Sequence, residues 1–371
     1  MISHFLYFIL IVTTLKQVCK SDENDISFLR QDFNLTVWNT LRQHIRCQTE
    51  HGNWTKEITA TTNTFKKNPS SQSPCDRDHK LNPYAQQGRC PTIFKGPSMN
   101  YSWEVSEKLC AHPLVKFNAS HFCEMMHQRV QGNIFFVGDS IQHEFAAEFT
   151  SALHIELGNQ HPKVSCRTCY HLCEAQIMYP QYCPKDRNSY VNYFNLSIDR
   201  NDYLHIHTNK NGSSSKSWES TLKSHNIGLL LMNRGAHFRP TAEVISDLNT
   251  TLSKVFELSP TISVVWRNTP PGHHDFEEKF FSPPSTSMPD LSGYYALKYK
   301  WNQFFAQNRA VESFLTEVFP QVLQLDFYTP TALRADSHID YLHYCIPGPL
   351  SLWPILLYNA LKIIDDYAMI Q

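Results

Sequence analysis

The residues best suited to chemistry lie in two short segments, FFVGDS at 135–140 and DYLHYC at 340–345. A serine hydroxyl is a weak nucleophile at its ordinary pKa and needs a base beside it, and an imidazole suits that role near neutral pH. His343 could take the proton of Ser140 and later return it to a leaving group. Asp340 comes three residues before His343, close enough to hold the imidazole in the productive tautomer. Together the two segments predict a triad of Ser140, His343 and Asp340 for acyl transfer.

The same chemistry needs hydrogen-bond donors for a developing oxyanion. Gly138 and Asp139 precede Ser140, whose backbone N–H at a helix N-terminus would supply one donor with help from the helix dipole. Asn233 and the backbone of Gly235, which follow a second apolar run, could supply others. The order Gly-Asp-Ser differs from the Gly-x-Ser-x-Gly elbow of the α/β-hydrolases, so that class is not matched.

Each feature also has a structural explanation. A serine that opens a helix is often only its N-cap, and Asp-x-x-His alone could be a loop salt bridge. Nearby, His273, His274 and Asp275 could suggest a metal site, and Asp336 with His338 offers a second acid and base. We expect no metal centre here. The segment with His273, His274 and Asp275 is expected to be a polar loop near the active edge. Asp336 and His338 are expected to brace the catalytic loop.

The elements that must position these residues alternate between strands and helices. Short apolar runs predict strands at 133–138, 227–233, 261–268 and 322–328, and apolar spacing predicts helices at 141–153, 241–258, 294–319 and 351–364. This alternation implies an α/β fold whose mainly parallel sheet is covered on both faces, with Trp301, Phe304 and Trp353 in the core. Ligands bind beyond the carboxyl ends of such strands, so the polar residues that follow the strands are expected to meet at one edge.

FFVGDS together with DYLHYCIPGPLSLW resembles the PC-esterase, or trichome birefringence-like, branch of the SGNH/GDSL acyl-esterase superfamily. That branch is characterised by Gly-Asp-Ser and a downstream D-x-x-H-[WY]-C-x-P-G motif, and residues 340–348 fill every position of the second motif. The segments GNW near Cys47, YSWEVSEKLC, FCEMMHQRVQGNIFFVGDS and MNRGAHF extend the similarity over roughly residues 45–365.

The resemblance implies an SGNH-like three-layer fold with Ser140 as nucleophile, His343 as base and Asp340 as the orienting acid. It implies O-acetylation of carbohydrate hydroxyls through an acyl-serine, with no bound cofactor but with an acetyl donor. A carbohydrate O-acetylesterase with the same triad is the alternative, and a non-catalytic glycan-binding protein is the second. Plant members follow Gly-Asp-Ser with a Leu-Ser-Arg-like run where this chain has IQH at 141–143, so the acceptor stays open.

The N-terminal sequence indicates the secretory pathway. The apolar stretch from Phe5 to Leu15 suits a signal-peptide core, so residues 1–20 are expected to be a signal peptide, with a short signal anchor as the alternative. Lys+Arg 33 against Asp+Glu 34 leaves a net charge of −1 and no electrostatic footprint for nucleic acid. The expected partners are a carbohydrate acceptor and an acyl donor, in the Golgi lumen or outside the cell, with no further membrane span.

Cysteines and glycosylation acceptors agree with that compartment. Cys19 lies in the leader, and the remaining cysteines could all form disulfides of unknown pairing: Cys47, Cys75, Cys90, Cys110, Cys123, Cys166, Cys169, Cys173, Cys183 and Cys345. The run CRTCYHLC has zinc-like spacing, but disulfides are expected in a lumenal protein. The N-x-S/T acceptors are Asn34, Asn53, Asn100, Asn118, Asn195, Asn211 and Asn249. We expect an irregular, disulfide-rich N-terminal subdomain at 21–125 and a catalytic domain at 126–371.

Overall fold

The computed structural model describes residues 35–56, 101–130, 133–157, 169–172, 175–178, 222, 226–234, 238–275, 279, 282–290, 299–338, 341–345 and 348–370. The expected signal peptide lies outside these residues, and so do Gly235 and Asp340 of the predicted site. For Ser140 only the backbone is described. The predicted disulfide and glycosylation residues outside the described ranges are Cys75, Cys90, Cys166, Cys173, Cys183, Asn34, Asn100, Asn195 and Asn211.

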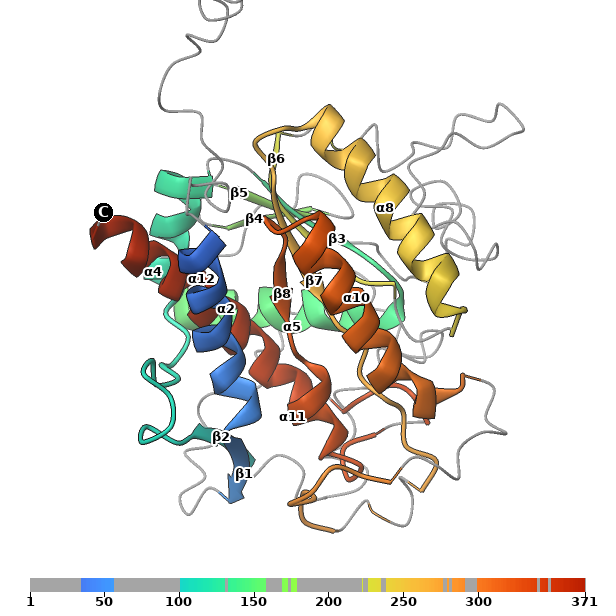
Figure 1. The fold of residues 1–371 in the computed structure, drawn as a ribbon. Coiled ribbons are helices and arrows are strands. Elements are labelled where there is room, and N and C mark those ends of the chain that lie inside the picture. The colour runs from blue at the N-terminus through green and yellow to red at the C-terminus, as the bar shows by residue number, and fades with distance from the viewer. Residues whose placement is uncertain are drawn as a thin grey trace, which may run out of the picture.

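A six-stranded sheet with the order β4-β5-β3-β6-β7-β8 forms the centre of the molecule (Figure 1). Its strands are β3 (Asn133–Val137), β4 (Cys169–Leu172), β5 (Ala175–Met178), β6 (Ile227–Met232), β7 (Ser263–Arg267) and β8 (Leu323–Leu325). Neighbours from β5 to β8 pair in parallel, and β4 pairs antiparallel with β5 at one edge. The expected α/β fold with a mainly parallel sheet is confirmed.

Helices cover both faces of this sheet (Figure 1). The bounds are α2 (Leu35–Glu50), α5 (Ser140–Leu157) and α12 (Trp353–Ile370) for one face, and α8 (Thr241–Leu258) and α10 (Phe304–Val318) for the other. Successive residues of β3 point to opposite faces, so Ile134 and Phe136 share a core with α5 and α12 while Phe135 and Val137 pack toward α8. Because both faces are covered, the central strands are largely apolar, with polar residues at their ends such as Asn133 and Arg267.

Two predicted elements differ from those observed. A 3₁₀ turn at Trp301–Gln303 opens α10, and Lys300 before it has a left-handed backbone with φ 48°, which sets the start of this helix later than expected. The strand expected over 322–328 ends at Leu325, because Asp326 turns the chain and accepts a hydrogen bond from Thr329 N–H at the start of α11 (Tyr328–Ala332). The expected core residues are confirmed as buried: Trp301, Phe304 and Trp353.

The remaining described elements are short. They are the antiparallel pair β1 (Gly52–Lys56) and β2 (Tyr101–Val105), helix α4 (Ala119–Met125) with a π turn at Met126–Val130, and a 3₁₀ turn at Pro349–Leu352 before α12. No helix in the described ranges is long and apolar enough to cross a membrane. The glycosylation acceptors that fall within these ranges are all exposed: Asn53, Asn118 and Asn249.

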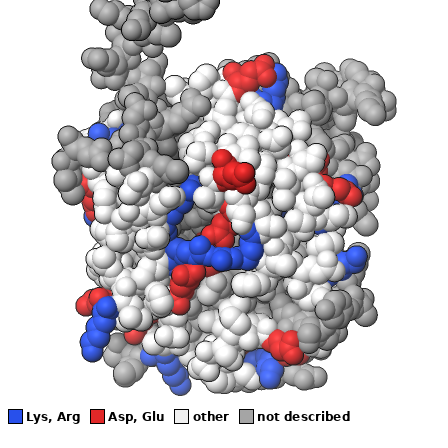
Figure 2. All heavy atoms as spheres, in the orientation of Figure 1, with Lys and Arg blue, Asp and Glu red and all other residues white. Residues whose placement is uncertain are grey.

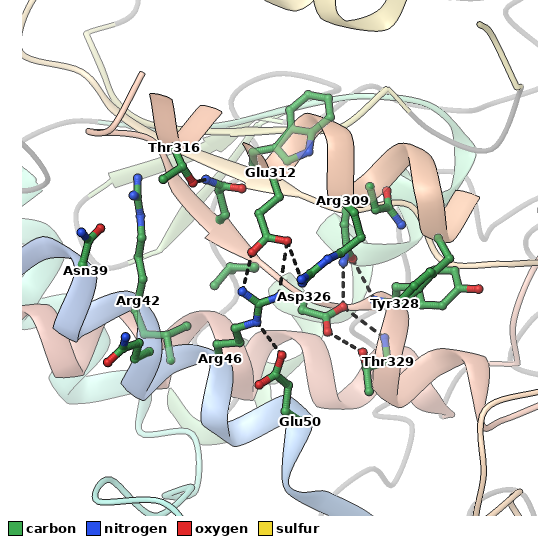
Figure 3. A pocket seen from close by; sticks show the side chains of 18 residues that line it. Asn39, Arg42, Arg46, Glu50, Arg309, Glu312, Thr316, Asp326, Tyr328 and Thr329 are labelled. Atoms are coloured by element: carbon green, nitrogen blue, oxygen red, sulfur yellow. Dashed lines mark hydrogen bonds and ion pairs between the residues drawn. The ribbon is translucent and has the colours of Figure 1, made fainter. Parts of the chain in front are cut away.

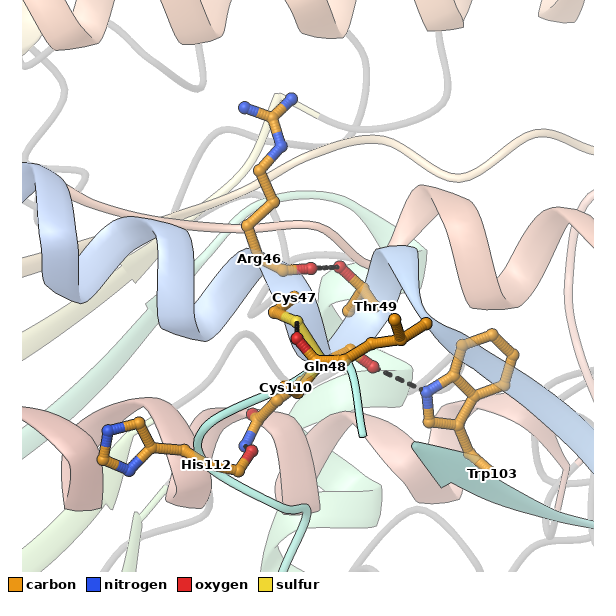
Figure 4. Close-up of a disulfide and its surroundings, with 8 residues drawn as sticks. Arg46, Cys47, Gln48, Thr49, Trp103, Cys110 and His112 are labelled. Carbon is orange, nitrogen blue, oxygen red and sulfur yellow. Dashed lines mark hydrogen bonds between the residues drawn. A yellow bond between two sulfur atoms is a disulfide. The ribbon is translucent and has the colours of Figure 1, made fainter. Parts of the chain in front are cut away.

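The N-terminal region is less irregular than expected, because it contains the 16-residue helix α2. Trp38, Leu41 and Ile45 on α2 belong to the same buried cluster as α12. A disulfide joins Cys47 at the end of α2 to Cys110 after β2 (Figure 4). Beside that disulfide, the Gln48 carbonyl accepts a 2.9 Å hydrogen bond from Trp103 Nε1 and the Gln48 amide donates to His112 O. Cys123 and Cys345 are also disulfide-bonded.

Candidate active site

The turn between β3 and α5 requires a glycine. A Cβ atom at Gly138 would lie 2.5 Å from Gln142 Cβ and 3.2 Å from Asn233 O. Its absence lets the end of β3 approach both the first turn of α5 and the end of β6. Gly138 therefore sets the close spacing of the three elements around the predicted nucleophile.

Asp139 caps helix α5. Its Oδ1 accepts hydrogen bonds from the backbone N–H groups of Ile141 at 3.0 Å and Gln142 at 3.4 Å. A carboxylate at this position satisfies amides that lack partners in the first turn and complements the helix dipole. Ser140 is the first residue of α5. The capping role that offered a structural explanation for Ser140 is thus filled by its neighbour.

Asn233 ties the ends of three strands together. Its Nδ2 donates to Arg267 O at 2.8 Å and to Thr269 Oγ1 at 3.1 Å, and its backbone N–H donates to Val137 O at 3.1 Å. An amide nitrogen carries two protons, so both are used within the protein, and an oxyanion would have to displace one of these acceptors. A donor role for Asn233 toward an oxyanion stays a prediction, while its strand-joining role is observed.

The buried Arg267 contacts the first turn of α5. Arg267 at the end of β7 is 1% exposed, and its Nε donates to Gln142 Oε1 at 2.8 Å. Gln142 Nε2 in turn donates to Leu231 O at 3.1 Å. The guanidinium also lies over the Trp353 ring, 5.0 Å from its centroid, which favours a cation in a dry site. The Gln142 side chain, two residues after Ser140, is therefore hydrogen-bonded to both β7 and β6.

His343 lies in the segment between α11 and the 3₁₀ turn before α12, and it is 7% exposed. Several hydrogen bonds hold this segment. Cys345 N–H donates to Ser337 O at 2.8 Å, and His273 N–H donates to Tyr341 O at 3.0 Å. The Tyr344 hydroxyl donates to Pro271 O. The loop is thus fastened to residues that follow β7, on the carboxyl side of the sheet.

Arg334 braces the beginning of the same loop. Its guanidinium donates to both carboxylate oxygens of Asp336, at 2.8 and 3.0 Å, and to Ser337 Oγ at 2.6 Å. It also lies 4.5 Å from the Trp54 ring centroid on β1, and Trp54 Nε1 donates to Pro330 O at 2.8 Å. Asp336 is thus bound to Arg334 and Ser337 at the start of this loop, and Trp54 of the N-terminal hairpin lies against the same arginine. Its role as a brace for the loop stays a prediction.

Helix α5 carries two buried carboxyl groups on the side that faces the loop. Glu144 and Glu148 follow Ser140 at intervals of four residues and are at most 3% exposed. Burial raises the pKa of Glu148 to about 7 against the opposing hydrogen bond from Ser351 Oγ, which lies 2.8 Å away. Burial, followed by the charge of Glu144, raises the pKa of Tyr344 well above its ordinary value. Tyr344, next to His343, belongs to the same buried cluster as Ile141 and Phe145 of α5.

The predicted site residues thus fall into two groups. Gly138, Asp139, Asn233 and the backbone of Ser140 meet where β3, β6 and α5 join. His343 lies on the loop whose Tyr344 belongs to the same buried cluster as residues of α5. Sequence reasoning missed other residues that fix this geometry: Gln142, Glu148, Arg334 and Tyr344. Polar residues inside otherwise apolar helical positions, as in IQHEFAAEF, were the signal for the first two.

The histidines at 273 and 274 have different surroundings. His273 is 1% exposed and is hydrogen-bonded at both ring nitrogens to His338 and Ala332. His274 points to solvent, and its Nδ1 lies 3.9 Å from Asp275 Oδ1. Among the described residues no group of three potential metal ligands is found. His338 bonds the His343 carbonyl at 3.0 Å, as expected of a brace for this loop.

A cavity of about 630 Å³ lies elsewhere, between α2, α10 and the end of β8 (Figure 3). Arg46 bridges Glu50 at 2.5 Å and Glu312 at 2.7 Å, and Arg309 donates to Glu312 at 3.1 Å. Basic and acidic side chains gather around a hollow on this face of the molecule (Figure 2). These charges pair beside the cavity and join α2 to α10, in addition to the burial of Trp38, Leu41 and Ile45 in the core.

The chain matches no protein-family model, and it matches no curated protein sequence. The similarity to PC-esterases rests on the motifs quoted from the sequence.

Proposed function

We propose that this protein is an O-acyltransferase that carries an acetyl group on Ser140 and passes it to a carbohydrate hydroxyl. The observation that carries the proposal is the hydrogen bonding of Asp139, which caps α5 and so removes the structural reason for a serine at the first helical position. The buried His343, whose neighbour Tyr344 belongs to the same buried cluster as residues of α5, supports the assignment of a base.

The proposed reaction has two halves with one covalent intermediate. The Ser140 hydroxyl attacks the acetyl carbonyl of the donor while His343 takes its proton, and the donor's leaving group departs with that proton. A carbohydrate hydroxyl then gives its proton to His343 and attacks the acyl-serine, and the proton returns to Ser140. Asp340, in this proposal, orients the imidazole and stabilises its charged form.

The oxyanion of each half would be stabilised at the N-terminus of α5. The Ser140 N–H and the helix dipole supply a donor and a positive field, and the Gly235 N–H is the proposed second donor. The buried Gln142 and Arg267 support this arrangement, because they fix the first turn of α5 before any substrate arrives. A rigid donor array costs little reorganisation during the reaction.

Hydrolysis by the same residues is the alternative outcome, with water in place of the sugar hydroxyl. The N-terminal sequence and the exposed glycosylation acceptors support a lumenal or secreted location, where glycan acceptors are present. No resident cofactor is proposed, and the acetyl donor is a co-substrate.

The test compares wild-type protein with Ser140→Ala on a chromogenic acetyl ester and a panel of deacetylated oligosaccharides. Serine-dependent release of acetate with a matching mass gain on a sugar is the expected result. Release without mass gain would replace the transferase by the esterase. Ser287→Ala, an exposed serine, is the matched control and should behave like wild type. If wild type and Ser140→Ala are equally inactive, acyl transfer is excluded and glycan binding remains.

A further inference from the structure

Two buried histidines form a hydrogen-bonded chain beneath the loop that carries His343. His273 Nε2 lies 2.9 Å from Ala332 O, and His273 Nδ1 lies 2.8 Å from His338 Nε2. His338 Nδ1 lies 3.0 Å from His343 O. Both rings are at most 1% exposed. This series of hydrogen bonds therefore connects the carbonyl of Ala332 in α11 with the backbone carbonyl of His343, the proposed base.

The protons in this chain can be counted. Each of the three contacts needs one hydrogen, and the carbonyl oxygens at the two ends only accept. Two neutral imidazoles carry one N–H each, which makes two hydrogens for three contacts. In the neutral pair, one contact must bring two lone pairs together at about 3 Å, where they repel. One additional proton from water satisfies all three contacts at once.

We propose that His338 is a positioning residue for His343. Its hydrogen bond to the His343 carbonyl depends on a single proton that it shares with His273. In the neutral pair the bond to His343 competes with the other two contacts for the available hydrogens. When the pair takes up a third hydrogen, the competition ends and the backbone at His343 is fixed. This inference rests on the proposed function only where it concerns the base; the proton count does not depend on it.

The surroundings set the pH range in which the extra proton is bound. Burial is the largest influence on His273 and lowers its pKa, with the exposed His274 acting in the same direction. The bond to Ala332 and the charges of Asp275 and Asp336 act in the opposite direction.

The groups that face His338 differ from those around His273. Asp336 is paired with Arg334, and the Tyr344 ring lies against His338 with centroids 4.2 Å apart, where it can face an imidazolium. Because burial has the largest effect, proton uptake is expected below the ordinary histidine value of about 6.5.

The direct experiment is an NMR pH titration of full-length protein labelled with ¹⁵N on its imidazole rings. His273→Gln and His338→Asn identify the two rings by loss of signal. We expect both rings to change together in one step below pH 6.5, with the gain of one proton for the pair. Independent titrations, or no change of either ring down to pH 5, would overturn the shared proton.

The functional experiment measures labelling of Ser140 by a fluorophosphonate as a function of pH. His338→Leu removes the donor to His343 and should slow labelling on the order of tenfold at the pH values where the pair holds its third hydrogen, because a small misplacement of a reacting group has such effects. The loss should be smaller where the pair is neutral. His338→Asn keeps a donor near the Nδ1 position and should restore most of the rate. Equal loss in both variants would assign His338 to packing alone and overturn the positioning role.

A matched pair isolates the proton itself. His273→Gln replaces a titrating ring by an amide with two permanent N–H donors, and it should remove the ionisation of the pair from the pH profile of labelling. His274→Gln changes an exposed neighbour and should leave the profile unchanged. A His273→Gln profile identical to that of wild type would overturn the proposal. If wild type is never labelled, the proposed function fails, and the NMR titration still decides on the shared proton.

Discussion

Arg267 Nε donates to Gln142 Oε1 across 2.8 Å, and both side chains are at most 1% exposed. The contact joins the end of β7 to the first turn of α5, and the Gln142 amide adds a bond to Leu231 O on β6. A neutral glutamine is a suitable partner here, because it accepts from the guanidinium at one end and donates to a strand carbonyl at the other. The pair thus fixes the residue that follows Ser140 by two positions.

Gln142→Leu should lower the free energy of unfolding by about 2–3 kcal/mol, because it leaves Arg267 Nε without this acceptor and Leu231 O without this donor. Urea unfolding followed by far-ultraviolet circular dichroism measures the change. The matched control is Gln128→Leu, since Gln128 is exposed and its π turn follows α4, where it bonds Glu124. That control should stay within about 0.5 kcal/mol of wild type. Equal effects of the two substitutions would contradict the buried role of Gln142.

Asp139→Ala should cost about 1 kcal/mol of stability, because the amides of Ile141 and Gln142 lose the oxygen that caps α5. Asp139→Asn keeps an acceptor oxygen at the same position, so most of that stability should return. Urea unfolding of the two variants measures both effects. If Asp139→Ala is as stable as wild type, another residue caps the helix, and Ser140 regains its structural explanation.

Much of the fold could be predicted from the periodicity of the apolar residues. Four runs of strand length became β3, β6, β7 and β8, because strands covered on both faces are largely apolar. Helix α2 was missed because its sequence LTVWNTLRQHIRCQTE contains many polar residues. The buried apolar residues of this helix are Trp38, Leu41 and Ile45. The cysteines nearby suggested an irregular segment.

The candidate site was predictable to a different degree at each position. The Gly138-Asp139-Ser140 turn follows from a strand, a glycine and a helix start in succession. The capping by Asp139 could not be separated from capping by Ser140, since both residue types favour that position. The His273–His338 contact spans 65 residues of sequence, and only the folded loop brings the two rings together.

Gly138→Ala should destabilise the protein by about 1–3 kcal/mol, because the new methyl group would lie 2.5 Å from Gln142 Cβ. Gln142 cannot move away easily, since both ends of its amide are hydrogen-bonded to buried partners. The displaced turn should also slow fluorophosphonate labelling of Ser140. Thermal unfolding and labelling of the same sample measure the two effects. An unchanged unfolding midpoint would show that the turn has more room than the structure gives it.

Glu148 should make the stability of the protein fall as the pH rises. Burial raises the pKa of Glu148 from 4.5 to about 7 in the folded state. Between these values the folded protein holds a proton that the unfolded chain has released, so each increase in pH favours unfolding. The full difference is reached above pH 7 and amounts to roughly 3 kcal/mol, because one pKa unit corresponds to about 1.4 kcal/mol.

Glu148→Gln removes the charge and keeps an oxygen that can accept from Ser351 Oγ. We expect it to raise the free energy of unfolding by roughly 3 kcal/mol at pH 8 and to leave it nearly unchanged at pH 4.5, where the native carboxyl is protonated in the folded state. Urea unfolding at the two pH values measures the difference. Glu107→Gln, at an exposed glutamate, is the control for a general charge effect and should show little change at either pH. A stabilisation of Glu148→Gln that is equal at both pH values would mean that the carboxyl at 148 is not the titrating group.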